Sequence, residues 1–355
     1  MSASDAHLEA LASCGYTPQE AHFLYLVATH SGYFLARQFL AFTRGHWGSR
    51  THLFWRKLRG RMHCRSGRIP GYGIVHQLFS GELYRLLGRE NLSKGREHEL
   101  DYVYRRIAVL DFVLSHPELD YLETEPEKRF FFEHTCNIPA HLLPSRTHRG
   151  TQVAEPTVRY FVDRFPMYFE KTSSPAAVTF SYIQPCEANL SNFARYLGVY
   201  LPLFRELPAF RFIYLARSSW PFEKARELFD SRVRIPLGSN PVDDLLRYFA
   251  VRRSWDLRQF DALSEDDLIF RNKVKDRFIA ARFERLYRAW STGRIGEEQV
   301  RREFPPNAQT HEIQFSTGLL KAVGKGGRAA ESNRQPQKPF LPAPATSDRA
   351  KLLLL

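Results

Sequence analysis

A basic segment from Ser49 to Arg68 constrains the fold of this 355-residue chain more than any other stretch. Ser49 is a residue type that often caps the N-terminus of a helix, and Gly60 stands where a helix commonly ends. Between them, three residues recur at the i, i+3 and i+7 spacing of one buried helical stripe: Thr51, Phe54 and Leu58. The segment therefore predicts an amphipathic helix of about three turns, followed by a short strand and a glycine-containing tip.

The flanking residues predict further helices and strands around this helix. Thr17, Pro18 and Glu20 form a capping-box start for a helix that continues to about Thr29. The other expected elements are a short strand at Gly32–Phe34, a helix at Ala36–Thr43, strands at Met62–Cys64 and Ile74–Leu78 joined by Arg65–Gly73, and a helix from Ser80 to Leu87. This order predicts a winged helix-turn-helix domain over residues 14–88.

Charge is distributed unevenly along the chain. The formal net charge is +13, yet no Asp or Glu occurs from Ala21 to Gly81, a stretch with nine Lys or Arg and six His. A solvated surface normally mixes both signs, and attraction to phosphate is the simplest reason to exclude carboxylates. The charge therefore favours an anionic partner, which is nucleic acid first and an acidic membrane surface second. The alternative is a basic protein that has no such partner.

In a winged helix, the third helix enters the major groove of DNA with its N-terminal part nearest the base edges. The candidates for base contact are therefore Ser49, Arg50 and His52. The candidates for phosphate contact are Arg56, Lys57 and Arg59. Two arginines that flank the expected wing tip are candidates for the DNA backbone or minor groove, Arg65 and Arg68. Protein binding by the same motif remains an alternative, because some winged helices bind proteins.

The second half of the chain predicts a small α/β domain with C-terminal helices over residues 101–292, reached through a linker at 89–100. β-branched and aromatic runs predict strands at Thr157–Val162, Val178–Ile183 and Phe210–Leu215. Apolar spacing predicts helices at Asp101–Leu114, Leu190–Phe204, Phe222–Phe229, Asp243–Ala250 and Glu265–Trp290. Strand, helix and strand at this spacing form a parallel crossover. Residues 318–355 are expected to be a disordered basic tail.

The order helix, strands, helix, strand is also that of a restriction-endonuclease-like core, in which acidic residues and a lysine hold a divalent metal and activate water. Asp163 is the candidate for the first carboxylate, but the strand Val178–Gln184 contains no carboxylate and no lysine. A metal-dependent nuclease with a rearranged site at Asp163 and Glu170 remains the alternative. Walker A, GxGxxG, GxSxG and HExxH motifs do not occur. The sequence therefore predicts no catalysis, no metal and no cofactor.

Other single residues carry structural expectations only. Trp55 is expected in the core, and His63 and His76 on the wing strands instead of at a metal. The four cysteines share no metal-ligand spacing and are expected to be reduced thiols in the cytoplasm. No apolar run approaches the roughly 18 residues that span a bilayer, and Met1–Asp5 lacks the features of a signal peptide. A membrane partner is therefore not expected.

The arrangement resembles the replication-relaxation family of plasmids and other mobile elements. The resemblance depends on Phe23–Leu86, Tyr160–Pro166, the strand at Val178, and Phe210–Leu215 with the helix that follows. It implies a winged helix followed by a degenerate endonuclease-like α/β domain. The implied function is sequence-specific binding of double-stranded DNA in replication control, mobilisation or transcription of a bacterial mobile element, with a homodimer or relaxosome and replication proteins as possible partners. Gln184 and Pro185 stand where an acidic residue often ends the family's strand, so the resemblance does not extend to a nuclease site.

Overall fold

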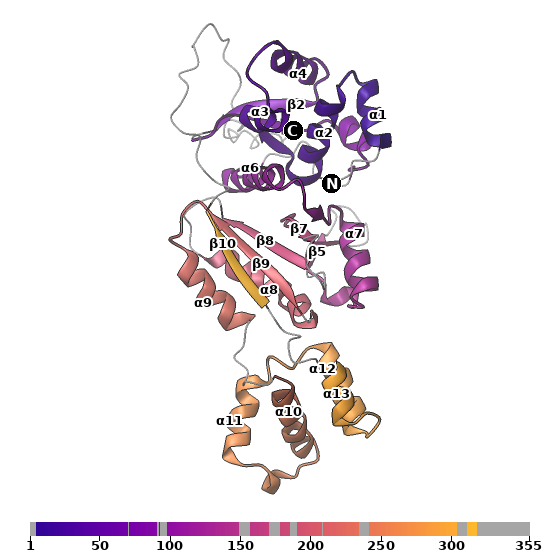
Figure 1. The fold of residues 1–355 in the computed structure, drawn as a ribbon, viewed down its shortest axis with the longest axis vertical. Helices are drawn as coiled ribbons and strands as arrows, with labels where there is room; N and C mark the ends of the chain where they lie inside the picture. Colours follow the sequence, from indigo (N-terminus) through magenta and orange to yellow (C-terminus); the bar gives the residue numbers. More distant parts are fainter. Residues whose placement is uncertain are drawn as a thin grey trace, which may run out of the picture. The chain divides into compact units, whose positions relative to one another are not determined.

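The computed structural model describes residues 5–69, 71–90, 92, 98–148, 157–169, 178–184, 190–207, 209–233, 241–303 and 311–317. The protein combines α-helices with several small β-sheets and divides into two compact units, the first ending at Glu118 and the second running from Leu119 to Thr317 (Figure 1). The expected tail at 318–355, half of the expected linker at 89–100, and Glu170 lie outside the described residues.

The first unit consists of helices around a three-stranded antiparallel sheet. Its elements are α1 (Asp5–Ser13), α2 (Pro18–Leu26), a π-helical turn (Val27–Ser31), β1 (Tyr33–Leu35), α3 (Ala36–Thr43), α4 (Ser49–Gly60), β2 (Cys64–Ile69), β3 (Gly73–Leu78), α5 (Gly81–Leu86) and α6 (Leu100–Ser115). Strand β3 lies between β1 and β2. The order of helices and strands from α2 to α5 is therefore the order predicted from the sequence.

The two predicted helix starts have different outcomes. The capping box of α2 is confirmed, because Thr17 Oγ1 accepts a hydrogen bond from Glu20 N at 3.3 Å and Glu20 Oε2 accepts one from Thr17 N at 2.8 Å. At α4 the prediction is wrong by one residue. The extended residue before the helix is Gly48, whose carbonyl accepts the first helical hydrogen bond from His52 N at 3.0 Å. Ser49 is therefore the first helical residue and not the cap.

The hairpin after α4 also differs from the prediction. Strand β2 was expected to end at Cys64, but pairing continues from Cys64, opposite Leu78, to Ile69, opposite Gly73. Because β2 is an edge strand, its outer side chains need not be apolar, so the sequence shows no clear alternation there. Arg65 and Arg68 consequently lie within the strand instead of beside the tip of the hairpin.

Helix α6 packs into the first unit, so the division of the chain falls after Glu118 and later than the expected linker at 89–100. The fully buried Arg106 donates hydrogen bonds to the carbonyls of Ser31, at 3.0 Å, and of His30. These carbonyls belong to the π-helical turn, which interrupts the regular pairing of α2. Arginine is rarely buried, so the sequence does not indicate that Arg106 lies in the core of the first unit. For this reason α6 was predicted to begin the second domain.

The second unit contains a five-stranded mixed sheet and a group of helices. Its elements are β4 (Asp120–Tyr121), α7 (Glu125–Phe130), a π-helical turn (Phe131–Thr135), a 3-10 turn (Ala140–Leu142), β5 (Ser145–His148), β6 (Thr157–Tyr160), β7 (Met167–Phe169), β8 (Val178–Gln184), α8 (Ser191–Glu206), β9 (Phe210–Ala216), α9 (Phe222–Arg232), α10 (Pro241–Asp256), a 3-10 turn (Phe260–Ala262), α11 (Glu265–Val274), α12 (Ala281–Ser291), α13 (Glu297–Glu303) and β10 (His311–Ser316).

The sheet order is β10-β9-β8-β7-β4, with β8, β9 and β10 parallel and the last two strands antiparallel to their neighbours. The predicted crossover from β8 through α8 to β9 is therefore confirmed. All seven residues of β8 are buried, as expected for a central strand covered on both faces. The predicted strand at Thr157–Val162 exists as β6, but it pairs with β5 in a separate two-stranded sheet.

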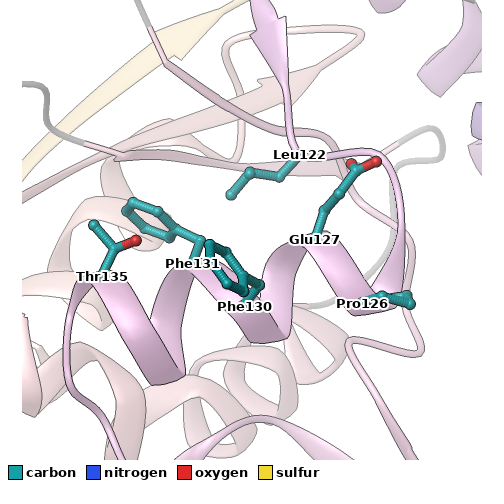
Figure 2. Close-up of a pocket in the computed structure, with 6 residues that line it drawn as sticks. All are labelled: Leu122, Pro126, Glu127, Phe130, Phe131 and Thr135. Carbon is teal, nitrogen blue, oxygen red and sulfur yellow. The ribbon is translucent and has the colours of Figure 1, made fainter. Parts of the chain in front are cut away.

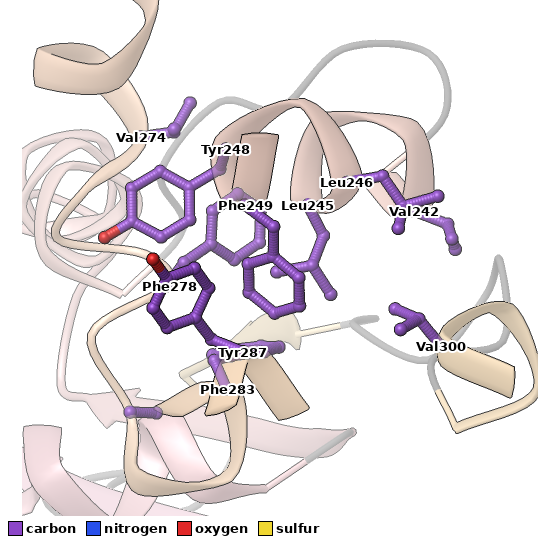
Figure 3. Close-up of a cluster of buried hydrophobic side chains, with 11 residues drawn as sticks. Val242, Leu245, Leu246, Tyr248, Phe249, Val274, Phe278, Phe283, Tyr287 and Val300 are labelled. Atoms are coloured by element: carbon purple, nitrogen blue, oxygen red, sulfur yellow. The ribbon is translucent and has the colours of Figure 1, made fainter. Parts of the chain in front are cut away.

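Helices α10 to α13 form a separate apolar cluster. In the chain they lie before β10, the last strand of the five-stranded sheet. Figure 3 shows side chains of this cluster converging, among them Leu245, Phe249 and Tyr287. The prediction of a single helix at Glu265–Trp290 is wrong, because the segment is divided into α11 and α12. In the connection, Arg277 donates to the Val233 carbonyl at 2.7 Å, and buried Phe278 packs against Tyr248 of α10 and Phe283 of α12.

Replacing Arg106 by methionine should destabilise the packing of α6 against the first unit. Two buried carbonyls lose their charged donor, which costs about 3 kcal/mol. Amide hydrogen exchange in residues 100–115 of the full chain should then accelerate roughly a hundredfold. The matched control is Arg85→Met on the exposed face of α5, where exchange should stay unchanged. Equal exchange rates in the two variants would contradict this role of Arg106.

Candidate nucleic-acid interface

An aromatic cluster fixes the orientation of α4. Phe54 is fully buried and stacks on Phe39, with ring centroids 4.1 Å apart. Trp55 is 6% exposed and stacks on His76 at 4.2 Å and on Phe34 at 5.6 Å. This confirms Trp55 as a core residue. Because adjacent helical positions hold large rings in the core, α4 cannot rotate without displacing them, and its opposite face is held outward.

The outward face of α4 combines cationic, apolar and small side chains. Its exposed residues are Ser49, Arg50, His52, Leu53, Arg56, Arg59 and Gly60. Among the described residues, no carboxylate forms an ion pair with Arg50, Arg56 or Arg59. The structure therefore brings six of the eight candidates onto one helix, and five of them are exposed: Ser49, Arg50, His52, Arg56 and Arg59.

Lys57 differs from these residues because it is already paired. Its Nζ lies 2.7 Å from Glu20 Oε2 and 6.0 Å from the centre of the Tyr16 ring. The pair joins α4 to the start of α2, and the Lys57 side chain is only 28% exposed. Phosphate contact by Lys57 would compete with this ion pair, so we regard it as a weaker candidate than the exposed arginines.

Arg65 and Arg68 do not act as a pair at a hairpin tip. They are three residues apart on β2, and side chains at this spacing point to opposite faces of a strand. Arg65 Nε donates to Gln77 Oε1 at 2.8 Å on the neighbouring strand, whereas Arg68 is exposed. A single duplex lying on one face of the hairpin can therefore contact only one of them.

The buried histidines of this region have structural partners. His63 Nδ1 lies 2.8 Å from Tyr16 Oη, and His76 Nδ1 lies 2.7 Å from Ser66 Oγ. Burial lowers the pKa of both imidazoles, and that of His76 falls to about 4, with the nearby Arg59 charge as a second cause. Within the described residues, no group of three or more His, Cys, Asp or Glu side chains could hold a metal ion.

Sequence reasoning missed three residues of this surface. Leu53 is 42% exposed at the middle of the cationic face, and Trp47, just before α4, is 54% exposed beside the His52 ring. Gly60 ends the helix with no atom within 4 Å of the position that its Cβ would occupy. For Leu53 and Gly60 the signal was present in the helical spacing, because both can be placed once the buried stripe is known. Trp47 precedes the helix, so that spacing does not place it.

We compared the whole chain with known proteins. No protein-family model, curated protein or solved structure matches it. The assignment of the α4 surface therefore depends on its own geometry and charge.

The second unit offers less for chemistry. Asp163 uses both carboxylate oxygens internally: Oδ1 accepts from Phe165 N at 3.0 Å, and Oδ2 accepts from Tyr200 Oη at 2.7 Å. Glu170, its expected partner in a rearranged metal site, lies outside the described residues.

None of the described helices is both long and apolar enough to cross a membrane.

A pocket of about 510 Å³ lies beside α7, and its wall is mostly apolar (Figure 2). Phe130, Phe131 and Leu122 provide most of this wall. The carboxylate among the lining residues, Glu127, caps its own helix and accepts hydrogen bonds from the backbone N–H groups of Thr124 and Glu123 at 3.2 and 2.8 Å. Glu127 is therefore already engaged by its own helix, and Thr135 is the other polar residue that lines the pocket.

The buried His76 should make the first unit less stable in mild acid. Its pKa is about 4 in the folded protein against 6.5 ordinarily, so the unfolded chain binds more protons between these values. Stability should be complete above pH 6.5 and fall by about 3 kcal/mol as the pH decreases to 4. The measurement is urea unfolding followed by tryptophan fluorescence. In His76→Gln the pH dependence should be smaller, and identical pH dependence in both proteins would contradict the assignment.

Proposed function

We propose that this protein binds double-stranded DNA in a sequence-specific manner through a winged helix-turn-helix in residues 14–88. The observation that carries the proposal is the outward face of α4, where Arg50, Arg56 and Arg59 are exposed and have no carboxylate partner among the described residues. DNA phosphates supply the negative charge that would pair with these arginines. The absence of Asp and Glu from residue 21 to residue 81 keeps repulsive charges away from it.

The order of elements supports a winged helix as the binding module. Helices α2, α3 and α4 are followed by the β2–β3 hairpin, and β1 completes the sheet. In this motif α4 is the recognition helix and the hairpin is the wing. Its width suits the role, because a helix with side chains is about 10–12 Å wide and the major groove is about 12 Å wide.

The second unit is proposed to supply partner contacts instead of chemistry. The order α7, β7, β8, α8, β9 agrees with a degenerate endonuclease-like core. Asp163 holds a turn and a buried tyrosine, and this engagement favours a structural role over metal binding. The proposal includes the role implied by the family resemblance, which is replication control, mobilisation or transcription of a mobile element in the bacterial cytoplasm, with a homodimer or replication proteins as partners.

Binding should be specific and should depend on salt through the arginines of α4. Duplexes selected by the full chain from a random library at about 150 mM salt should share one motif. The logarithm of affinity for that motif should fall linearly with the logarithm of salt concentration, and Arg59→Ala should reduce the slope by about 1.

The matched control is Arg285→Ala, which removes an exposed arginine from α12 in the second unit. It should leave both the affinity and the slope unchanged. Failure to retain any duplex would contradict the proposed function and favour a protein-binding module. Equal effects of the two substitutions would mean that DNA binds without a special role for α4.

The absence of catalysis is tested separately on supercoiled plasmid DNA with Mg²⁺ or Mn²⁺. Because both Asp163 oxygens are engaged in internal hydrogen bonds, neither the protein nor Asp163→Asn should nick the plasmid. Metal-dependent nicking that disappears in Asp163→Asn would instead establish the nuclease alternative.

A further inference from the structure

We propose that Leu53 is a specificity-determining residue that contacts the C5-methyl group of a thymine in the major groove. The inference rests on the proposed DNA binding and names the base that one position of α4 selects. It arises from the placement of an exposed leucine at the centre of a cationic helical face.

Four residues form the outermost line of α4. An α-helix turns by about 100° per residue, so positions i, i+4, i+7 and i+11 lie almost directly above one another. The residues with this spacing are Ser49, Leu53, Arg56 and Gly60. They lie opposite the buried stripe of the same helix, which contains Thr51, Phe54, Trp55 and Leu58. This line therefore projects furthest from the first unit.

Cationic or polar side chains border this line on both sides. His52 and Arg59, spaced i and i+7, form one border, and Arg50 and Lys57, also spaced i and i+7, form the other. Lys57 is bound to Glu20, but Arg50, His52 and Arg59 are exposed. A helix in the major groove has a phosphate chain on either side and base edges in front. The borders of α4 thus match the phosphates, and its central line matches the bases. This arrangement exchanges the roles expected from the sequence: Arg50 and His52 would face phosphates, and Arg56 would face bases.

The central line carries the chemistry of base recognition. Leu53 is 42% exposed, so the core of the first unit does not account for its apolar side chain. In the major groove, the apolar group that distinguishes one base is the methyl group of thymine. Arg56 follows three residues later on the same line and offers two donors suited to guanine. A thymine with a guanine nearby is therefore the composition that this line can read.

The small residues at the two ends of this line allow α4 to approach the bases of the DNA closely. Ser49 is small, and Gly60 has open space where a side chain would stand, so packing within the described residues does not require a glycine there. A larger residue at either end would hold the helix away from the floor of the groove. The small ends leave Leu53 and Arg56 as the side chains that reach furthest forward.

Replacement of thymine by uracil tests the contact, because the two bases differ only in the methyl group. Each thymine of the selected motif is replaced singly, and the affinity of the full chain for each duplex is measured. At one position, uracil should weaken binding about fourfold, the effect of one buried methyl group. Leu53→Ala should bind the thymine and uracil duplexes at that position equally.

Leu268→Ala is the matched control, because Leu268 is 37% exposed on α11 in the second unit. This variant should still discriminate fourfold against uracil. Two results would overturn the inference while leaving DNA binding intact: equal binding of thymine and uracil duplexes at every position, or full discrimination by Leu53→Ala. Absence of binding to any selected duplex would overturn the proposed function together with the inference.

Discussion

The aromatic packing beneath α4 is the interaction on which the proposed function depends. Phe54 and Trp55 are large, adjacent and buried, and their stacking on Phe39 and His76 determines which face of the helix meets solvent. Rotation of the helix by one residue would turn either Arg50 and Lys57 or His52 and Arg59 toward the core. Burial of an unpaired charge costs several kcal/mol. The packing of the core therefore determines which face of α4 is exposed, as well as which of its residues are buried.

In the part of the chain that the structure describes, some arginines are paired with carboxylates and others are not. In the helices of the second unit, arginines form ion pairs with nearby carboxylates, as Arg247 does with Asp267 and Arg252 with Glu284, each pair within 2.8 Å. On α4, by contrast, the exposed arginines have no such partner among the described residues. Surface ion pairs contribute little to stability, so this difference concerns binding more than folding.

Local signals in the sequence were sufficient for α2 to α5 apart from the length of β2, but they did not predict α1 or the limits of the first unit. The Thr17 capping box, the buried stripe of α4 and Ser80, whose side chain accepts a hydrogen bond from Leu83 N at the start of α5, lie within a few residues of the structure they specify. The membership of α6 depends on Arg106 and on residues 75 or more positions away, and no local pattern reports such a contact. The same reason explains why β10 was not predicted. It pairs with β9, and helices α9 to α13 lie between these two strands in the chain.

The candidate site was predictable in its location and less so in its detail. The basic helix and its buried stripe were evident from the sequence, but the exposed side chains could be divided into a central line and two borders only once their exposure and their partners were known. Lys57 and Arg65 looked equivalent to the other cations because their partners, Glu20 and Gln77, lie on different elements. Leu53 was overlooked because an exposed leucine within a helix has no meaning until the direction of the helix is known.

Hydroxyl-radical oxidation of side chains, read by mass spectrometry, tests most directly whether α4 meets DNA. The chain offers two matched pairs of exposed residues: Leu53 (42%) with Leu257 (56%), and Trp47 (54%) with Trp255 (40%). On binding the selected duplex, oxidation of Leu53 and Trp47 should fall several-fold, whereas oxidation of Leu257 and Trp255 should not change. Protection of Leu257 and Trp255 with Leu53 and Trp47 still reactive would contradict the account and place the DNA on the second unit.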